Sequence, residues 1–339
     1  MQSTAMEADQ PRTGDDRAMD RVLTLELVRV TERAAIAAAL MRGRGDEKAA
    51  DQAAVDAMRT ELNRLRIRGR IVIGEGERDE APMLYIGEEV GTGEGPEVDI
   101  ALDPLEGTTI CAKNLPNALA VIAITRRGNL LHAPDVYMEK VAVGPGFPDN
   151  FLDINQPPDE TIRRIAEHKG VKTRNVTACV LDRPRHARLI EAIRSTDAAI
   201  RLIGDGDVAG IIHTTAPDDT GIDIYMGIGG APEGVLAAAA LRCIGGQMCG
   251  RLILDSDEKR ARAERMGITD PARVYRTEDM ASGDVLFAAT GVTDGSMLNG
   301  VKFDNALAST HTVVTRSHTG TQRWVKALHR FTEKYALID

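Results

Sequence analysis

The chain has 339 residues, of which 43% are hydrophobic and 27% are charged, as is usual for a globular protein. This length predicts about two domains, or two halves of one large layered unit. The formal net charge is −9 and aromatic residues make up only 3% of the chain, which disfavours nucleic acid and anionic membranes as partners. An acidic protein can still bind a phosphorylated metabolite where metal ions reverse the local charge.

The cysteines also restrict the class of protein. They do not form paired Cys-x-x-Cys motifs, so a zinc ribbon is not expected, and their apolar surroundings predict buried thiols. We find neither a signal peptide nor an apolar run of membrane-spanning length, so a cytoplasmic protein without a membrane partner is expected. The cysteines are Cys111, Cys179, Cys243 and Cys249.

In chain order, residues 1–19 are polar and charged, and we expect a disordered tail there. Apolar residues at helical spacing then predict a helix from Arg21 to Met41 and a second helix after Asp46. An alternation of strands and helices is predicted to follow, through the segments 71–73, 83–90, 98–102, 108–112 and 118–125.

A second alternation begins near Asn175. It predicts α/β layers without an internal repeat, and a boundary between Phe151 and Gly170 that divides the chain into residues 20–160 and 161–339. Strands are expected at 176–181, 199–203, 223–226, 285–289 and 312–315, and helices at 185–193, after Asp205, at 232–244 and at 321–335.

Two carboxylates follow a short apolar run at Ile100–Leu102. Asp103 ends that run, Pro104 is expected to stop the strand, and Glu106 comes three positions after Asp103. Hard divalent cations prefer carboxylate oxygens, so the pair indicates a Mg²⁺ or Mn²⁺ site in a phosphate enzyme. An Asp-Pro turn followed by a glutamate in the first turn of a helix explains the same residues.

Two further acidic positions favour the metal site. Glu75 follows the apolar run Ile71–Ile73 between two glycines, which allow close backbone approach. Asp46 lies between the two predicted helices, where it can cap the second helix and still offer an oxygen to a metal. Acidic loop positions of this kind suggest a phosphate site with more than one metal ion.

The second half of the chain contributes a glycine-rich turn at 227–234. It follows a predicted strand and opens a helix, with Pro232 and Glu233 in the first helical turn. Glycines before a helix N-terminus can cradle a phosphate. A dinucleotide fingerprint is excluded because Pro232 stands at the position of its third glycine.

Two other turns carry polar groups. Asp182-Arg-Pro-Arg-His186 could hold a phosphate through its arginines, although a solvated helix start explains it too. Asp205-Gly-Asp207 lacks the remaining ligands of a calcium loop, so we interpret it as a binder of sugar hydroxyls or as a helix cap.

Together these segments resemble the class II fructose-1,6-bisphosphatases of bacteria, a family within the lithium-sensitive phosphatase superfamily. The resemblance runs in order from about Leu23 to about Leu328, and it implies a layered α-β-α-β-α sandwich of the sugar phosphatase type. The Asp-Pro-Leu-Glu-Gly-Thr motif alone is shared with inositol monophosphatases. The segments that carry the resemblance begin or centre on Gly43, Ile71, Asp103, Ala133, Asp182, Asp205 and Gly227.

The resemblance also implies roles for single residues. Thr108 acts in catalysis with help from Asp46, residues 20–160 form the metal-binding half and residues 161–339 the sugar-phosphate-binding half. The implied ligands of Mn²⁺ or Mg²⁺ are Asp46, Glu75, Asp103, Glu106 and Glu233. The implied substrate contacts are Glu106, Gly107, Thr108, Tyr137, Arg183, Pro184, Arg185, Asp205, Gly206, Asp207 and Gly230.

The implied reaction is hydrolysis of the 1-phosphate of fructose 1,6-bisphosphate by a homo-oligomer (dimer or tetramer). Sedoheptulose 1,7-bisphosphate is a second candidate substrate, because the family includes dual bisphosphatases. Another superfamily phosphatase, such as an inositol monophosphatase-like enzyme, is the nearest alternative. A non-catalytic sugar-phosphate sensor would be expected to lack a metal ligand, and the full implied set is present.

Overall fold

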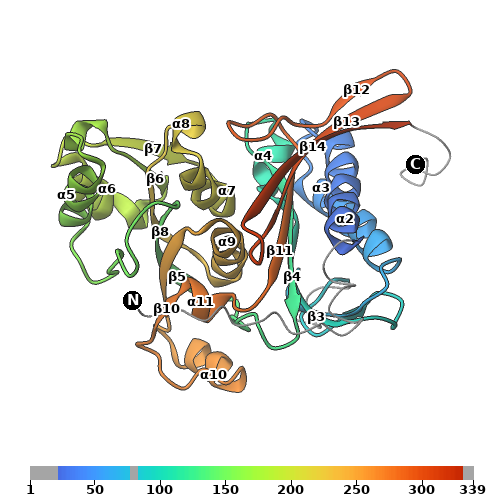
Figure 1. Ribbon diagram of the computed structural model, residues 1–339, viewed down its shortest axis with the longest axis horizontal. Helices are drawn as coiled ribbons and strands as arrows, with labels where there is room; N and C mark the ends of the chain where they lie inside the picture. The colour runs from blue at the N-terminus through green and yellow to red at the C-terminus, as the bar shows by residue number, and fades with distance from the viewer. Residues whose placement is uncertain (1–21, 77–82, 331–339) are drawn as a thin grey trace, which may run out of the picture.

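The computed structural model describes residues 22–76 and 83–330, which form five layers in the order helix, sheet, helix, sheet, helix (Figure 1). The expected α-β-α-β-α sandwich is therefore confirmed. The tail predicted at residues 1–19 lies outside the described residues. In the part of the chain that is described, no helix is long and apolar enough to cross a membrane.

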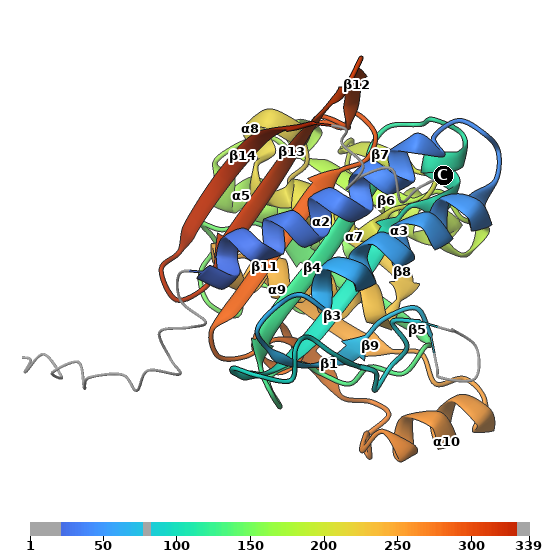
Figure 2. The same ribbon diagram turned by 90° about the vertical axis from the view of Figure 1, so that its right-hand side faces the viewer.

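One outer layer consists of the first two helices in the described part of the chain, α2 (Val22–Leu40) and α3 (Glu47–Leu62), which lie side by side across the first sheet (Figure 2). The side chain of Asp46 caps α3 by accepting a hydrogen bond from the Ala49 N–H at 3.0 Å. Leu27 and Met58, which are fully buried, belong to the apolar cluster between these helices and the sheet. Burial of this kind is the main favourable contribution to folding.

The first sheet has eight strands, with β1 and β3 parallel and the other pairs antiparallel. Its path runs β12-β13-β11-β4-β3-β1-β2, and β14 pairs with β13 at the edge. The strands are β1 (Arg68–Ile73), β2 (Glu89–Val90), β3 (Glu97–Glu106), β4 (Leu119–Arg126), β11 (Val285–Gly291), β12 (Lys302–Asp304), β13 (Leu307–Arg316) and β14 (Thr321–Arg330).

The second sheet has six strands in the order β10-β9-β5-β8-β6-β7. Its outer face is covered by α5 (Pro158–Lys169) and α6 (Ala187–Arg194) (Figure 1). The strands are β5 (Tyr137–Val143), β6 (Thr177–Leu181), β7 (Ala199–Ile203), β8 (Ile224–Gly230), β9 (Gln247–Leu252) and β10 (Val274–Arg276).

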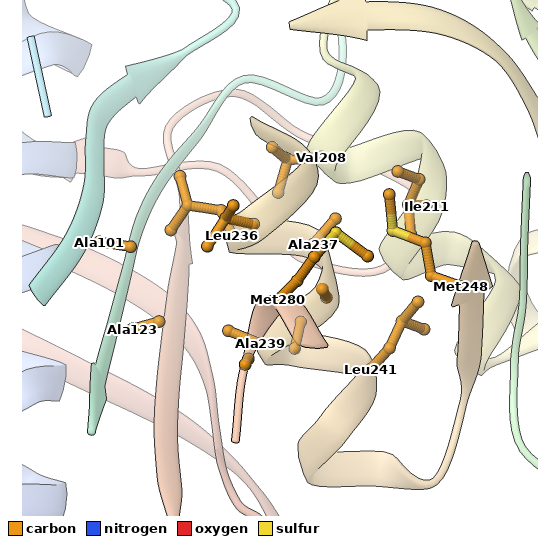
Figure 3. Close-up of a cluster of buried hydrophobic side chains, with 14 of the residues drawn as sticks. Ala101, Ala123, Val208, Ile211, Leu236, Ala237, Ala239, Leu241, Met248 and Met280 are labelled. Carbon is orange, nitrogen blue, oxygen red and sulfur yellow. The ribbon is translucent and has the colours of Figure 1, made fainter. Parts of the chain in front are cut away.

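The helices between the two sheets are α7 (Asp207–Ile212), α9 (Ala231–Ile244) and α11 (Thr277–Met280) (Figure 1). Alanines and leucines of α9 are buried on every side, because one sheet lies on each side of the helix (Figure 3). The remaining helices are the short α4 (Thr108–Ala112) and α8 (Pro217–Thr220) and the peripheral α10 (Asp257–Arg265).

The last predicted element is wrong: residues 321–330 form a strand, not a helix, and 331–335 lie outside the described residues. β14 pairs with β13 along its whole length, from Thr321 opposite Arg316 to Arg330 opposite Leu307. Its exposed side chains alternate with half-buried ones from Trp324 to Arg330, which is the period of a strand. Pairing with β13 therefore outweighed the local helical pattern.

The division of the chain near residue 160 does not coincide with the division between the sheets. β5 precedes that boundary but lies in the second sheet, and β11 to β14 follow it but lie in the first sheet. The chain thus returns to the first sheet after it has completed the second sheet. Among the other predicted segments, 83–90 forms a strand only at Glu89–Val90, and 108–112 is a helix.

Candidate active site

Two neighbouring strand ends bring the first carboxylates together. β1 and β3 are parallel, with Ile73 opposite Ala101, so their carboxyl ends meet at one edge of the sheet. Glu75 follows β1 there, and Asp103 stands near the end of β3. The strand does not stop at Pro104 as predicted, because the ladder with β4 resumes at Glu106 after a shift in register.

Glu106 also reaches the middle layer. Its Oε1 accepts a hydrogen bond from the backbone N–H of Val208 in α7 at 2.9 Å. Gly107 then turns the chain into α4 with φ +83°, a left-handed backbone conformation that residues with a side chain rarely adopt. Thr108 follows as the first residue of α4 and is half-buried.

A cavity of about 410 Å³ lies over these strand ends, between the sheet edge and the start of α9. Thr108 and Gly107 line it together with the carboxylates of Asp51, Glu75, Asp103, Glu106, Asp135, Asp205 and Glu233. Four of the five carboxylates implied as metal ligands are thus gathered in one cavity. Asp46, the fifth, is exposed, caps α3 and is not among the lining residues.

Burial and the repulsion between their negative charges make these carboxyl groups harder to ionise. Burial, then Asp103 and Asp51, raise the pKa of Glu75 to about 9. Burial also raises the pKa of Asp103 to about 6 and, followed by the charge of Asp207, that of Glu233 to about 7. For Glu106, burial and then Asp103 hold the pKa well above its ordinary value. A cation among them would favour the ionised forms.

The donors suit divalent cations such as Mg²⁺ and Mn²⁺. The Oε2 atom of Glu233 is buried without a hydrogen-bond partner among the described residues, and unpaired buried oxygens of this kind are costly unless a cation or donor meets them. All of the donor atoms are carboxylate oxygens, the ligands that hard cations prefer. Within residues 22–76 and 83–330, no group of three or more such side chains is already spaced to enclose an ion.

Sequence reasoning missed Asp51 and Asp135. Asp51 lies in the second turn of α3 and turns toward Glu75 and Asp103, whose pKa values it raises. The sequence offered one signal for Asp51: it lies five residues after Asp46, at the start of the same predicted helix. A helix that begins at a proposed metal ligand can bring its next acidic residue to the same site. Asp135 lies in an irregular segment before β5, and the sequence there offers no period from which its direction could be predicted.

The predicted sugar contacts surround the start of α7 and α9. Asp205 lines the carboxylate cavity, and Asp207 begins α7 with a buried side chain. Gly230 precedes α9, and a Cβ atom there would lie 1.9 Å from Oε2 of Glu233, so only glycine leaves room for that carboxylate.

The two arginines of the predicted phosphate grip line different cavities. Arg183 lines a cavity of about 530 Å³ that shares Asp205 with the carboxylate cavity. Arg185 lines a cavity of about 500 Å³ on the other side of the Pro184 turn. Its guanidinium donates to the Ile228 carbonyl from Nε at 3.1 Å and from Nη2 at 2.7 Å, and it lies 4.7 Å from the centre of the Tyr137 ring.

The sequence matches the family described as "Bacterial fructose-1,6-bisphosphatase, glpX-encoded" over residues 21–329, and the chain belongs to that family. The resemblance drawn from the motifs is thereby confirmed. The chain is thus an enzyme of the phosphatase class, and phosphatases of this type depend on metal ions.

Curated relatives agree along nearly the full length. The chain is 46% identical over 336 residues to the D-fructose 1,6-bisphosphatase class 2/sedoheptulose 1,7-bisphosphatase of Synechococcus sp. (strain JA-3-3Ab), covering 92% of this chain and 96% of that protein. It is 45% identical over 344 residues to the equally named protein of Trichodesmium erythraeum (strain IMS101), covering 94% and 99%.

Among solved structures, the extragenic suppressor protein suhB from Bartonella henselae matches with a TM-score of 0.33 and 16% identity. The match covers 58% of this chain and 74% of that chain.

Proposed function

We propose that this protein hydrolyses the 1-phosphate of fructose 1,6-bisphosphate to give fructose 6-phosphate and phosphate, at the cavity lined by Glu75, Asp103, Glu106 and Glu233. The observation that carries the proposal is the set of buried carboxylates with raised pKa values around the unpartnered Oε2 of Glu233. Such a set favours the binding of a cation. Hydrolysis of a phosphate dianion needs such a positive charge, because the dianion repels a nucleophile.

Divalent ions held there would neutralise the charge of the phosphate and act as Lewis acids on its oxygens. Glu75, Asp103, Glu106 and Glu233 would hold them, with Asp46 as the further ligand that the family suggests. The turnover measured with each ion in the assay below decides between Mn²⁺ and Mg²⁺.

Thr108 is proposed to orient the attacking water through its hydroxyl group, since this residue lines the same cavity. The water oxygen attacks phosphorus, the bond between phosphorus and the C1 oxygen breaks, and a proton passes to that oxygen. A hydroxyl is too weak a base to accept the proton of the water alone, so a carboxylate is needed. The family motifs give that role to Asp46, whose exposed carboxylate would have to turn from its cap position on α3 toward the cavity.

The sugar and the distal phosphate are proposed to lie on the second-sheet side. Asp205 and Asp207 can accept hydrogen bonds from sugar hydroxyls, beside Gly206 and Gly230. Beyond its two bonds to Ile228, Arg185 has N–H donors without a partner among residues 22–76 and 83–330, and Arg183 lines the neighbouring cavity. A charge-assisted contact from one or both would hold the phosphate that remains on the product.

Release of phosphate from several substrates tests the proposal. We expect turnover of fructose 1,6-bisphosphate with Mn²⁺ or Mg²⁺, none after chelation, and little with inositol 1-phosphate. Preference for inositol 1-phosphate would contradict it. Sedoheptulose 1,7-bisphosphate belongs in the same assay, because the relatives named above carry that activity in their names. The homo-oligomer and the cytoplasmic location stay predictions.

A further inference from the structure

A buried lysine lies beside the carboxylate cavity. Lys140 stands in the middle of β5, opposite Gly227 of β8 and Gly250 of β9, and its side chain is 0% exposed. Its Nζ forms an ion pair with Oδ2 of Asp207 and donates to the carbonyl oxygen of Gly230 at 2.8 Å. Lysine is almost never fully buried unless it is paired, so these two contacts account for its presence in the sheet.

Small residues make room for this side chain. A Cβ atom at Gly229 would lie 1.8 Å from Oδ2 of Asp207 and 3.0 Å from Nζ of Lys140. At Gly234, in the first turns of α9, a Cβ atom would lie 3.4 Å from Cδ of Lys140. The lysine therefore passes between the end of β8 and the start of α9, and the missing side chain at Gly229 leaves room for its ion pair with Asp207.

The partners of Lys140 belong to both sides of the site. Asp207 begins α7, which also donates the Val208 N–H to Glu106. Gly230 precedes α9, and the Glu233 carboxylate lies against it. Lys140 also lowers the pKa of Glu233, against the larger effects of burial and of Asp207. One buried cation thus contacts the sugar-side turn and the segment that carries a metal-side carboxylate.

We propose that Lys140 is a positioning residue that fixes Asp207 and the Gly230 carbonyl to each other, so that the sugar-binding turn and Glu233 keep one relative placement. This proposal rests on the proposed function of the same cavity. Lys140 is among the residues that line the cavity of Arg185, but its side chain is fully buried, so it acts through Asp207 and Gly230 and not on substrate or ion. A buried ion pair is weak grounds for stability by itself, because desolvation offsets the attraction between the charges. Such a pair can instead serve to hold two parts of a site, here the sugar-binding turn and Glu233, in fixed positions relative to each other.

The test compares Lys140→Met with Lys169→Met in the full-length protein. Lys169 forms a second lysine–aspartate pair with Asp223; its side chain is 34% exposed, but Asp223 is buried, accepts a hydrogen bond from the Thr177 N–H and lies outside the lining of the carboxylate cavity. The measurements are the Tm, the Kd for Mn²⁺ without substrate by calorimetric titration, and the KM for fructose 1,6-bisphosphate. If Lys140→Met does not fold, Lys140→Gln, which keeps a donor for Gly230, takes its place.

We expect both variants to lower the Tm, and only the Lys140 variant to raise the Mn²⁺ Kd and the KM, each by about 10-fold or more. Equal shifts in the Lys169 variant would overturn the proposal, because they would show general destabilisation. Values for the Lys140 variant within about two-fold of wild type would also overturn it. If wild type does not hydrolyse the bisphosphate, the proposed function fails, and the Mn²⁺ Kd still decides the role of Lys140.

Discussion

Glu106 and Val208 are joined by a hydrogen bond of 2.9 Å, although 102 positions separate them in the chain. The bond connects the end of β3 in the first sheet to the first turn of α7 in the middle layer. It leaves the second oxygen of Glu106 for other partners, among them the neighbouring Asp103. Glu106 therefore has a structural contact beside its proposed role as a metal ligand, and substitutions can separate the two.

Glu106→Gln keeps an amide oxygen for Val208 but removes the negative charge. We expect a folded protein with a Tm close to wild type and turnover lower by on the order of 10²-fold, because the proposed metal ligand has lost its charge. Glu106→Ala should also lower the Tm, since the buried Val208 N–H then has no acceptor. Turnover of the Gln variant near that of wild type would show that the charge is not needed.

Asp51→Asn tests the carboxylate that sequence reasoning missed. Asp51 raises the pKa of Glu75 and Asp103, so its charge acts on both. We expect the variant to bind Mn²⁺ about 10-fold more weakly, by calorimetric titration. Asp56→Asn is the matched control, because Asp56 is exposed on the same helix. Equal Kd values for the two variants would exclude Asp51 from the metal site.

Thr108→Ala should lower kcat sharply and leave KM nearly unchanged, because the hydroxyl is proposed to act on the water and not on the sugar. Thr108→Ser should retain part of the turnover. Thr109→Ala, at the next position of α4, serves as the control because Thr109 lines the neighbouring cavity. If the Ala and Ser variants at position 108 have the same kcat, the hydroxyl has no chemical role.

Arg185→Ala should raise the KM for fructose 1,6-bisphosphate by about 10-fold, which corresponds to a hydrogen bond with a charged group of ~1.5 kcal/mol. Arg185→Lys should restore little, because an ammonium group cannot reproduce the planar contacts with Ile228 and the Tyr137 ring. Arg188→Ala, in the same cavity, is the control for a general loss of positive charge. An unchanged KM for Arg185→Ala would place the distal phosphate elsewhere, with Arg183 as the next candidate.

The chelated protein should lose stability as the pH rises from about 5 to 8. Glu75, Asp103 and Glu233 have folded pKa values of about 9, 6 and 7, above their ordinary values, so the folded state holds protons that the unfolded state has released. The free energy of unfolding therefore falls with rising pH until the folded groups also ionise. Mg²⁺ competes with these protons, so its stabilising effect should be larger at pH 8 than at pH 5.

Thermal unfolding with and without Mg²⁺ at several pH values measures this effect. Glu233→Gln should weaken the pH dependence of the chelated protein, because one of the groups with a raised pKa is removed. A Tm of the chelated protein that rises from pH 5 to pH 8 would contradict the prediction.

Several features of the site follow from the sequence because they depend on local patterns. Glu75 and Asp103 each follow an apolar run, and parallel pairing of β1 with β3 places both at one sheet edge. The family motifs then identify Glu233 in the other half of the chain. The family motifs also mark Gly107, which the structure places in a left-handed conformation before α4.

Other features depend on long-range packing and could not be predicted. β14 is a strand because β13 offers it a partner, and no local pattern in residues 321–330 reports that partner. The return of the chain to the first sheet at β11 is likewise a matter of topology. Arg183 and Arg185 are two residues apart, yet the Pro184 turn directs them to different cavities.

The alanine-rich α9 has a further consequence for how this enzyme can vary. The helix separates the two sheets and also carries Glu233, so the span between Glu233 and the carboxylates of the first sheet depends on the bulk of the side chains along it. Replacing Ala237 or Ala239 with a larger residue would push the sheets apart and shift Glu233 from a distance. Mutational tolerance should therefore be lowest in a helix where most residues never contact substrate.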